Sequence, residues 1–167
     1  PLIIIGSSHL LNLQKKKLKY HLKIKKIKKN FNTKDFDKDK LSIYDIKYKQ
    51  KKSFQKISSK SNNYIFDCFT TAISLINKKK ILGFINCPVS KETLFKNKHL
   101  GVTEFLSKKS KIEGKEAMLI YNKKLSVSPL TTHIPLNEVS RNIKKTKIIK
   151  KVKLINNFYK ENFSKNP

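Results

Sequence analysis

The order of apolar and polar positions predicts a chain that opens as strand, turn and helix. Residues 2–5 form a continuous apolar run closed by Gly6, a pattern typical of a strand buried on both faces of a parallel sheet. Ser7 or Ser8 follows where it can cap a helix whose apolar positions are leucines. Residues 20–27 and 41–46 alternate apolar with polar side chains, so each is expected to form a strand.

The clearest helical periodicity lies at residues 61–77, where Ile65, Phe69, Ala72 and Ile76 recur on one helical face. The apolar run 81–86 follows and ends at a proline, which cannot donate to a sheet ladder. This run therefore predicts a buried strand. A helix followed at once by a buried strand indicates a βαβ unit.

The second half of the chain continues the alternation. It predicts a helix at 103–110, strands at 117–121 and 125–130, a helix from Asn137 through Ile143, and a final helix at 146–163. The whole pattern predicts one α/β domain over residues 1–167. Its three layers would be a mostly parallel central sheet with helices on both faces. Within it, residues 28–60 are polar and poorly defined.

Length and composition agree with a folded domain. The chain has 167 residues, of which 38% are apolar, and this supplies a core and argues against wholesale disorder. Lysines interrupt every apolar run well before the roughly 20 residues that a membrane span needs, so no transmembrane segment is expected. Cys68 and Cys87 show no metal-site or paired spacing and are expected to be free thiols of a cytoplasmic protein.

The net charge of +28 raises the question of a polyanionic partner. Lysine supplies 38 of the 39 basic residues and Arg141 the other, although arginine is favoured in phosphate and base recognition. The lysines are spread along the whole chain without a binding motif, and Lys, Asn and Ile share A/T-rich codons. A lysine-rich nucleic-acid-binding module is therefore the alternative function class. Drift in genome composition is the preferred explanation of the charge, because no binding motif accompanies it.

No segment carries a nucleotide-binding fingerprint, and no two of the four histidines have metal-ligand spacing. His133 stands out by its place, because it follows the predicted strand 125–130 and precedes Pro135. Ligands of open α/β sheets bind beyond the carboxyl ends of the strands. An imidazole there could ligate a divalent metal or exchange protons. It could equally cap the strand through hydrogen bonds, and the spacing leaves both readings open.

Two other sites could bind anions. Gly101, Val102 and Thr103 stand at a predicted helix start, where free amides and the helix dipole attract phosphate or carboxylate. An ordinary helix start explains them as well, because Glu104 suits a first turn. Lys91 follows the predicted strand 81–86 and could bind an anionic group, or be one more solvated lysine.

Three blocks in order carry a resemblance: Asn86-Cys87-Pro88-Val89-Ser90-Lys91, then Gly101-Val102-Thr103-Glu104-Phe105-Leu106, then Thr131-Thr132-His133-Ile134-Pro135-Leu136 followed by Glu138-Val139-Ser140. Together they resemble the 4-hydroxythreonine-4-phosphate dehydrogenases of pyridoxine biosynthesis. The opening strand and the helix at 61–77 also fit the amino-terminal half of that family. The resemblance therefore covers nearly the whole chain.

The resemblance implies NAD-dependent oxidation of 4-phosphohydroxy-L-threonine, followed by decarboxylation to 3-amino-2-oxopropyl phosphate in pyridoxal 5'-phosphate biosynthesis. It implies a divalent metal (Zn, Mg or Co) bound by His133, substrate contacts by Thr103 and at the positions of Val102 and Lys91, and a cytoplasmic homodimer with a phosphorylated small-molecule substrate and no membrane or nucleic-acid partner. It assigns neither catalytic nor NAD-binding residues.

Two departures from the family change what is expected. The family has histidine where this chain has Val102, so one substrate contact is expected to be lost or supplied otherwise. The family's chain is also about twice as long, has two domains, and carries two further metal-binding histidines in its second half. Because a catalytic metal ordinarily needs about three protein ligands, this amino-terminal portion is expected to be inactive alone, or to be a remnant that only folds or dimerises.

Overall fold

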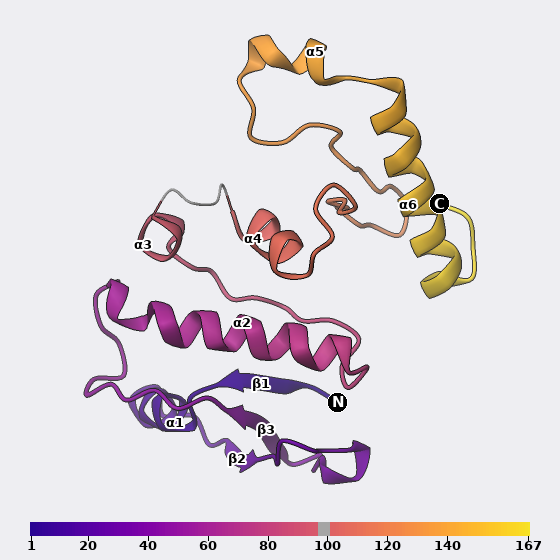
Figure 1. The fold of residues 1–167 in the computed structure, drawn as a ribbon. Coiled ribbons are helices and arrows are strands. Elements are labelled where there is room, and N and C mark those ends of the chain that lie inside the picture. The colour runs from indigo at the N-terminus through magenta and orange to yellow at the C-terminus, as the bar shows by residue number, and fades with distance from the viewer. Residues whose placement is uncertain (97–100) are drawn as a thin grey trace. The chain divides into compact units, whose positions relative to one another are not determined.

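The computed structural model describes residues 1–96 and 101–167 (Figure 1). The chain divides into two compact units, Pro1–Asn97 and Lys98–Pro167. That the two units make up one domain stays a prediction.

The strands are β1 (Ile3–Gly6), β2 (Lys23–Lys26) and β3 (Lys40–Asp45). The α-helices are α1 (Ser8–Lys17), α2 (Asn62–Asn77), α3 (Lys91–Phe95), α4 (Val102–Lys109), α5 (Val139–Asn142) and α6 (Lys145–Phe163), and the 3-10 helices are η1 (Thr33–Asp35), η2 (Ser59–Ser61) and η3 (Leu136–Glu138). Among the described residues, the strands lie in the first unit together with α1, α2 and α3, and the second unit contains α4, α5 and α6.

The three strands form one parallel sheet in the order β1-β3-β2. The register pairs Ile4 with Ile43 and Ile24 with Leu41. Because β3 has a strand on each side, its Ile43 is completely buried, with an exposed fraction of 0%. The predicted α/β class with a mostly parallel sheet is confirmed, as are the predicted strands at 2–5, 20–27 and 41–46.

The turn from β1 into α1 is fixed by a close approach of α2. The Ser7 side chain accepts a hydrogen bond from the Leu10 amide at 3.2 Å, so the predicted cap is confirmed. The Ser7 amide donates to the Tyr64 hydroxyl of α2 at 2.9 Å. A Cβ added at Gly6 would lie 2.9 Å from the same hydroxyl, so glycine is needed here for space.

Helix α2 covers the sheet with the face that the periodicity predicted. Its buried residues Phe69, Ala72 and Leu75 lie on one side of the helix, and α2 packs along β1 (Figure 1). The helix ends where Lys79 adopts a φ of 53° and the Lys80 amide donates to the Leu75 carbonyl at 2.9 Å. The predicted helix at 61–77 is confirmed.

The predicted buried strand at 81–86 is wrong. These residues form no strand, and Leu82 and Ile85 have exposed fractions of 107% and 92%. Phe84 contacts the ring of Phe69 at a centroid distance of 6.1 Å. An apolar run shows only that a segment prefers burial, whereas a strand also needs a pairing partner. In the described part of the chain, β1, β2 and β3 pair only with one another.

The strands predicted at 117–121 and 125–130 are also wrong. The two segments meet at a single antiparallel bridge, in which Ile120 and Val127 exchange hydrogen bonds of 2.8 and 3.0 Å. Met118 and Leu125 are exposed on either side of it. The pairing stops after one residue pair, and the Ser128 side chain donates instead to the Met118 carbonyl at 2.7 Å.

The helices of the second unit follow their predictions more closely. Helices α4 and α6 confirm the segments 103–110 and 146–163. The helix predicted from Asn137 to Ile143 is divided into η3 and α5, and Asn137 lies inside η3 and does not cap it. Pro135 occupies the cap position, and its fixed φ of −56° suits the start of a helical turn.

Both cysteines are free thiols, with Cys68 half-buried in α2 and Cys87 exposed. A search for membrane-crossing helices among residues 1–96 and 101–167 finds none with the necessary length and apolar character.

Candidate functional site

Thr103 is placed by the first turn of α4. Gly101 precedes the helix in an extended conformation, with φ −171°. Phe105 and Ser107 are buried and fix the helix within its unit. Thr103 is exposed beside these residues, so its hydroxyl and the first free amides of the helix are open to a ligand.

His133 lies in a loop rather than at the end of a strand, which corrects the expected setting. Its φ is 55°, in the left-handed region that non-glycine residues rarely adopt. The side chain is exposed. Such backbone strain persists only where the surroundings determine the conformation, and it is concentrated at functional sites. Because the residues just before His133 form no strand, His133 does not cap one.

Helix α6 holds the loop that leads to His133. The Lys151 ammonium donates to the carbonyl of Pro129 at 2.7 Å and to that of Leu130 at 3.3 Å. Eight residues along the helix, the Tyr159 hydroxyl donates to the Ser126 side chain at 2.8 Å. Positions eight apart lie on nearly the same helical face. One face of α6 thus supports the loop at two points.

Thr103 and His133 line the same cavity. Its volume is about 650 Å³, which is within the range of small-molecule sites. The other lining residues come from the first turn of α4, the loops on either side of the bridge, and α6: Glu104, Gly114, Lys115, Glu116, Met118, Leu130, Thr132, Lys147, Lys150, Lys151 and Leu154. All of them belong to the second unit.

The cavity wall carries charges of both signs. One carboxylate oxygen each of Glu104 and Glu116 is buried, and neither has a hydrogen-bond partner among the described residues. Lys147 and Lys150 face the same space from α6. A ligand with both cationic and anionic groups would be complementary to such a wall, because buried carboxylate oxygens without a partner are costly.

The other two predicted site residues do not line this cavity. Val102 is half-buried beside Thr103 and presents only an aliphatic side chain. Lys91 is the exposed first residue of α3 in the first unit, where Ser90 caps the helix and accepts a 3.4 Å hydrogen bond from the Thr93 amide. Substrate roles for Val102 and Lys91 stay predictions.

The described residues do not make up a metal site by themselves. In residues 1–96 and 101–167, no three His, Cys, Asp or Glu side chains gather as metal ligands. His133 offers one imidazole, whereas a catalytic metal takes about three protein ligands. Any metal bound at His133 would therefore need ligands from outside these residues.

Sequence reasoning missed Glu116 and the three lysines of α6 that line the cavity. No signal separated Lys147, Lys150 and Lys151 from the other lysines of the chain, because the periodicity of α6 shows only which residues share a face. Their common cavity follows from the loop that packs on the helix.

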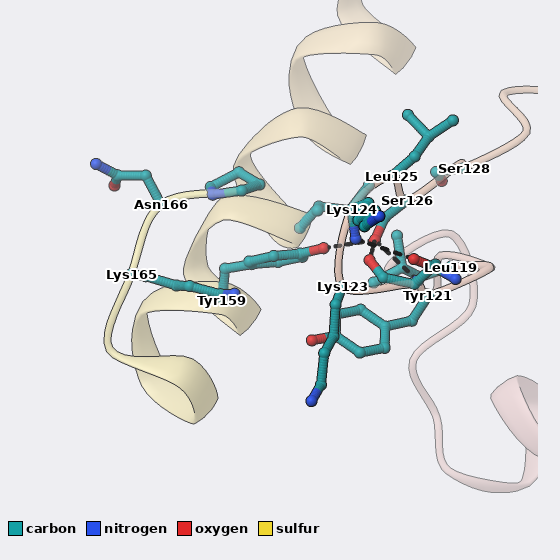
Figure 2. Close-up of a pocket in the computed structure, with 13 residues that line it drawn as sticks. Leu119, Tyr121, Lys123, Lys124, Leu125, Ser126, Ser128, Tyr159, Lys165 and Asn166 are labelled. Atoms are coloured by element: carbon teal, nitrogen blue, oxygen red, sulfur yellow. Dashed lines mark hydrogen bonds between the residues drawn. The ribbon is translucent and has the colours of Figure 1, made fainter.

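A second cavity of about 440 Å³ lies between the bridge segment and the end of α6 (Figure 2). Figure 2 shows the Tyr159 hydroxyl directed at Ser126, with Tyr121 below them. Tyr121 stacks on Phe163 at a centroid distance of 5.2 Å. No predicted site residue lines this second cavity.

A parallel sheet with covering helices defines an α/β protein, and its second unit contains a cavity of a size that suits a small molecule. A family model described as "Pyridoxal phosphate biosynthetic protein PdxA" matches residues 1–167. The chain belongs to this family. The resemblance inferred from the three ordered blocks is therefore confirmed.

Named relatives agree with the family. The chain is 34% identical over 164 residues to a 4-hydroxythreonine-4-phosphate dehydrogenase of Sulfurihydrogenibium, covering 96% of this chain and 49% of the relative. It is 42% identical over 89 residues to the protein of the same name from Aquifex aeolicus, covering 52% of this chain and 28% of that one. The chain thus spans about half the length of its Sulfurihydrogenibium relative.

Solved structures show the same fold. The crystal structure of a 4-hydroxythreonine-4-phosphate dehydrogenase from Klebsiella pneumoniae superimposes with a TM-score of 0.76 at 19% identity. The match covers 96% of this chain and 49% of the Klebsiella chain. At this identity the comparison supports the fold alone.

Proposed function

We propose that this chain is the amino-terminal portion of an NAD-dependent 4-hydroxythreonine-4-phosphate dehydrogenase. In the proposed reaction the secondary alcohol of 4-phosphohydroxy-L-threonine would be oxidised, with bound NAD supplying the hydride acceptor, and the resulting β-keto acid would lose carbon dioxide to give 3-amino-2-oxopropyl phosphate. The observation that carries the proposal is that Thr103 and His133, separated by 30 positions, line one cavity. The names of the relatives support the reaction class.

The chain's own residues have definable tasks in this proposal. The Thr103 hydroxyl and the amides of the first turn of α4 would bind an anionic group of the substrate. Lys147 and Lys150 would add positive charge from the opposite element of the wall. Glu104 and Glu116 would accept hydrogen bonds from its cationic group. These contacts bind and orient an amino acid phosphate, which carries both kinds of charge.

His133 has the role that stays most open to test. We propose that its imidazole contributes one ligand to a divalent cation in a longer protein of this family. The described residues contain no group of three metal ligands, so the 167-residue chain is expected to bind substrate but not to turn it over.

We further propose a cytoplasmic homodimer. Two free thiols suit a reducing compartment. The dimer rests on the resemblance and is tested by light scattering of the purified chain, where a monomer mass would contradict it.

A binding experiment tests the proposed function. 4-Phosphohydroxy-L-threonine is titrated into the isotope-labelled chain, and the expected result is that amide signals shift chiefly around Thr103 and His133. Thr103→Val should weaken binding on the order of tenfold, because it removes one hydroxyl, and Thr103→Ser should retain it. Inorganic phosphate as a control ligand should cause smaller, scattered shifts. Equal shifts for both ligands would contradict a specific site.

The charge of +28 requires a second arm for the nucleic-acid alternative. Filter binding of a DNA duplex is measured at 50 and 200 mM salt. A dedicated binder making 6–10 phosphate contacts would lose about 10³- to 10⁵-fold in affinity between these conditions. Tight, salt-sensitive duplex binding without any substrate response would favour that alternative over the dehydrogenase.

Val102 offers a gain-of-function test. Valine stands where the family has histidine, so Val102→His should restore one donor beside Thr103 and tighten substrate binding up to about tenfold. Val102→Leu is the matched control for size. Equal or weaker binding by the histidine variant would show that the pocket has adapted to valine.

A further inference from the structure

We infer that Lys151 is a positioning residue that fixes the loop carrying Thr132 and His133, rather than a ligand-binding lysine. This inference deepens the proposed function and rests on it for the identity of the ligand. It starts from the two carbonyls that the Lys151 ammonium binds, at 2.7 Å from Pro129 and 3.3 Å from Leu130.

The Lys151 ammonium already donates hydrogen bonds within the protein. Lysine has three donors and no acceptor, and two of the donors of Lys151 are directed at backbone carbonyls. Lys147, one helical turn earlier, donates to the Asn142 side chain at 3.2 Å. Lys150 lines the same cavity and takes no part in these bonds. The three lysines therefore differ in task although they share one wall.

The carbonyls of Pro129 and Leu130 lie just before the cavity-lining residues Thr132 and His133. Leu130 is three positions before His133, so the Lys151 bonds fix the backbone on the amino-terminal side of the turn. On the other side, Pro135 restricts φ and occupies the cap position before η3. The strained φ of 55° at His133 is thus held between two constraints.

Helix geometry makes this support rigid. Lys151 is half-buried, whereas the nearby Lys150 and Lys153 of the same helix are exposed. Tyr159, two turns further on the same face, is buried and bonded to Ser126. A bond from a charged donor to a half-buried carbonyl is stronger than a neutral one. Loss of the ammonium should release the loop locally while Tyr159 keeps α6 in place.

The test compares three variants of the 167-residue chain. Lys151→Met keeps the aliphatic stem and removes the donors, Lys151→Arg keeps donors, and Lys150→Met removes the same charge from the same wall. Backbone order parameters from NMR relaxation are expected to fall at residues 130–134 in Lys151→Met alone, to values below about 0.6. Lys151→Arg should keep the order parameters of the unchanged chain. Equal order parameters in Lys151→Met and Lys150→Met, or a decrease spread evenly over residues 101–167, would overturn the inference.

Substrate affinity provides a second readout. Lys153→Met loses the same charge from an exposed position of α6 that does not line the cavity, so any additional weakening in Lys151→Met measures positioning rather than electrostatics. The additional loss is expected to be about tenfold for 4-phosphohydroxy-L-threonine. The relaxation experiment needs no ligand, so it can support Lys151 even if no substrate binds, which would contradict the proposed function alone. Substrate shifts at Thr103 and His133 together with unchanged order parameters would contradict Lys151 alone.

Discussion

The two units of the chain hold their backbone in different ways. In the first, β1, β3 and β2 form a parallel ladder, and α2 covers it with Phe69, Ala72 and Leu75. In the second, a single bridge replaces a sheet, and side chains of α6 hold the loops. A ladder satisfies many backbone groups at once, whereas the loop of residues 118–130 in the second unit is held by individual bonds, several of them from side chains.

The difference matches the place that we propose for function. The residues that line the cavity lie in the unit with few buried apolar side chains, which are Phe105 and Tyr159 among the described residues. Loops without a ladder are free to place polar groups in unusual conformations, as at His133. In the proposed function the first unit contributes stability and the second contributes chemistry, and the following predictions test this division.

The largest effect is expected in the first unit at Ile43. It is completely buried on the central strand, so Ile43→Ala should lower the free energy of unfolding by about 2–5 kcal/mol, through lost burial and a cavity. Urea unfolding followed by circular dichroism measures the change. Ile57→Ala, at a side chain that is 74% exposed, is the control and should have little effect. Similar losses of unfolding free energy for both variants would contradict the place of Ile43 in the core.

A smaller effect is expected at Gly6, where β1 approaches α2. A methyl group would meet the Tyr64 hydroxyl at 2.9 Å, so Gly6→Ala should cost about 1–3 kcal/mol. Gly83→Ala is the control, because a Cβ there meets nothing within 4 Å. Tyr64→Phe combined with Gly6→Ala should cost less than the sum of the two single changes. Additive costs would show that the hydroxyl is not the obstacle.

In the second unit, the backbone of His133 predicts a preference for glycine. At a φ of 55°, His133→Gly should be more stable than His133→Ala by about 1 kcal/mol, because only the alanine retains the left-handed strain. Ile134, the next residue, is outside the left-handed region, so Ile134→Gly should be the less stable of the corresponding pair. The measurement is thermal unfolding. The same order at both positions would contradict strain at His133.

The smallest effect is expected at alkaline pH, again in the first unit. Burial raises the pKa of Tyr64 to about 12 and that of Cys68 to about 11, from ordinary values of 10.0 and 9.0. The folded state therefore retains protons that the unfolded state loses. The stability contributed by these groups is complete below about pH 9 and is lost as the pH rises from 9 to 12.

Denaturant midpoints between pH 8 and 12 test this dependence. Tyr64→Phe and Cys68→Ala should each make the alkaline decline shallower than in the unchanged chain. Tyr20→Phe, at an exposed tyrosine, should leave it unchanged and so corrects for the titration of the many lysines. If all three variants show the same dependence of the denaturant midpoint on pH as the unchanged chain, the burial of Tyr64 and Cys68 has no effect on alkaline stability.

The accuracy of the sequence-based predictions follows the range of the interactions involved. Helix α2 was predicted because its apolar spacing reflects its own hydrogen bonds and one buried face. The segments 81–86 and 125–130 were predicted as strands because apolar runs indicate burial, but pairing depends on partners elsewhere. Thr103 was expected at a helix start and lies at one, whereas His133 was expected at a strand end and lies in a loop.

The sequence by itself determined the helices α1, α2, α4 and α6, the opening parallel strands and the family, since periodicity, caps and short motifs are local properties of the chain. Only the tertiary structure decided that Thr103 and His133 share a cavity, that Glu104 and Glu116 face it, and which lysine supports the loop. The physical reason is distance along the chain. These contacts join residues from 12 to 30 or more positions apart, and no repeating pattern encodes which of many similar side chains will meet.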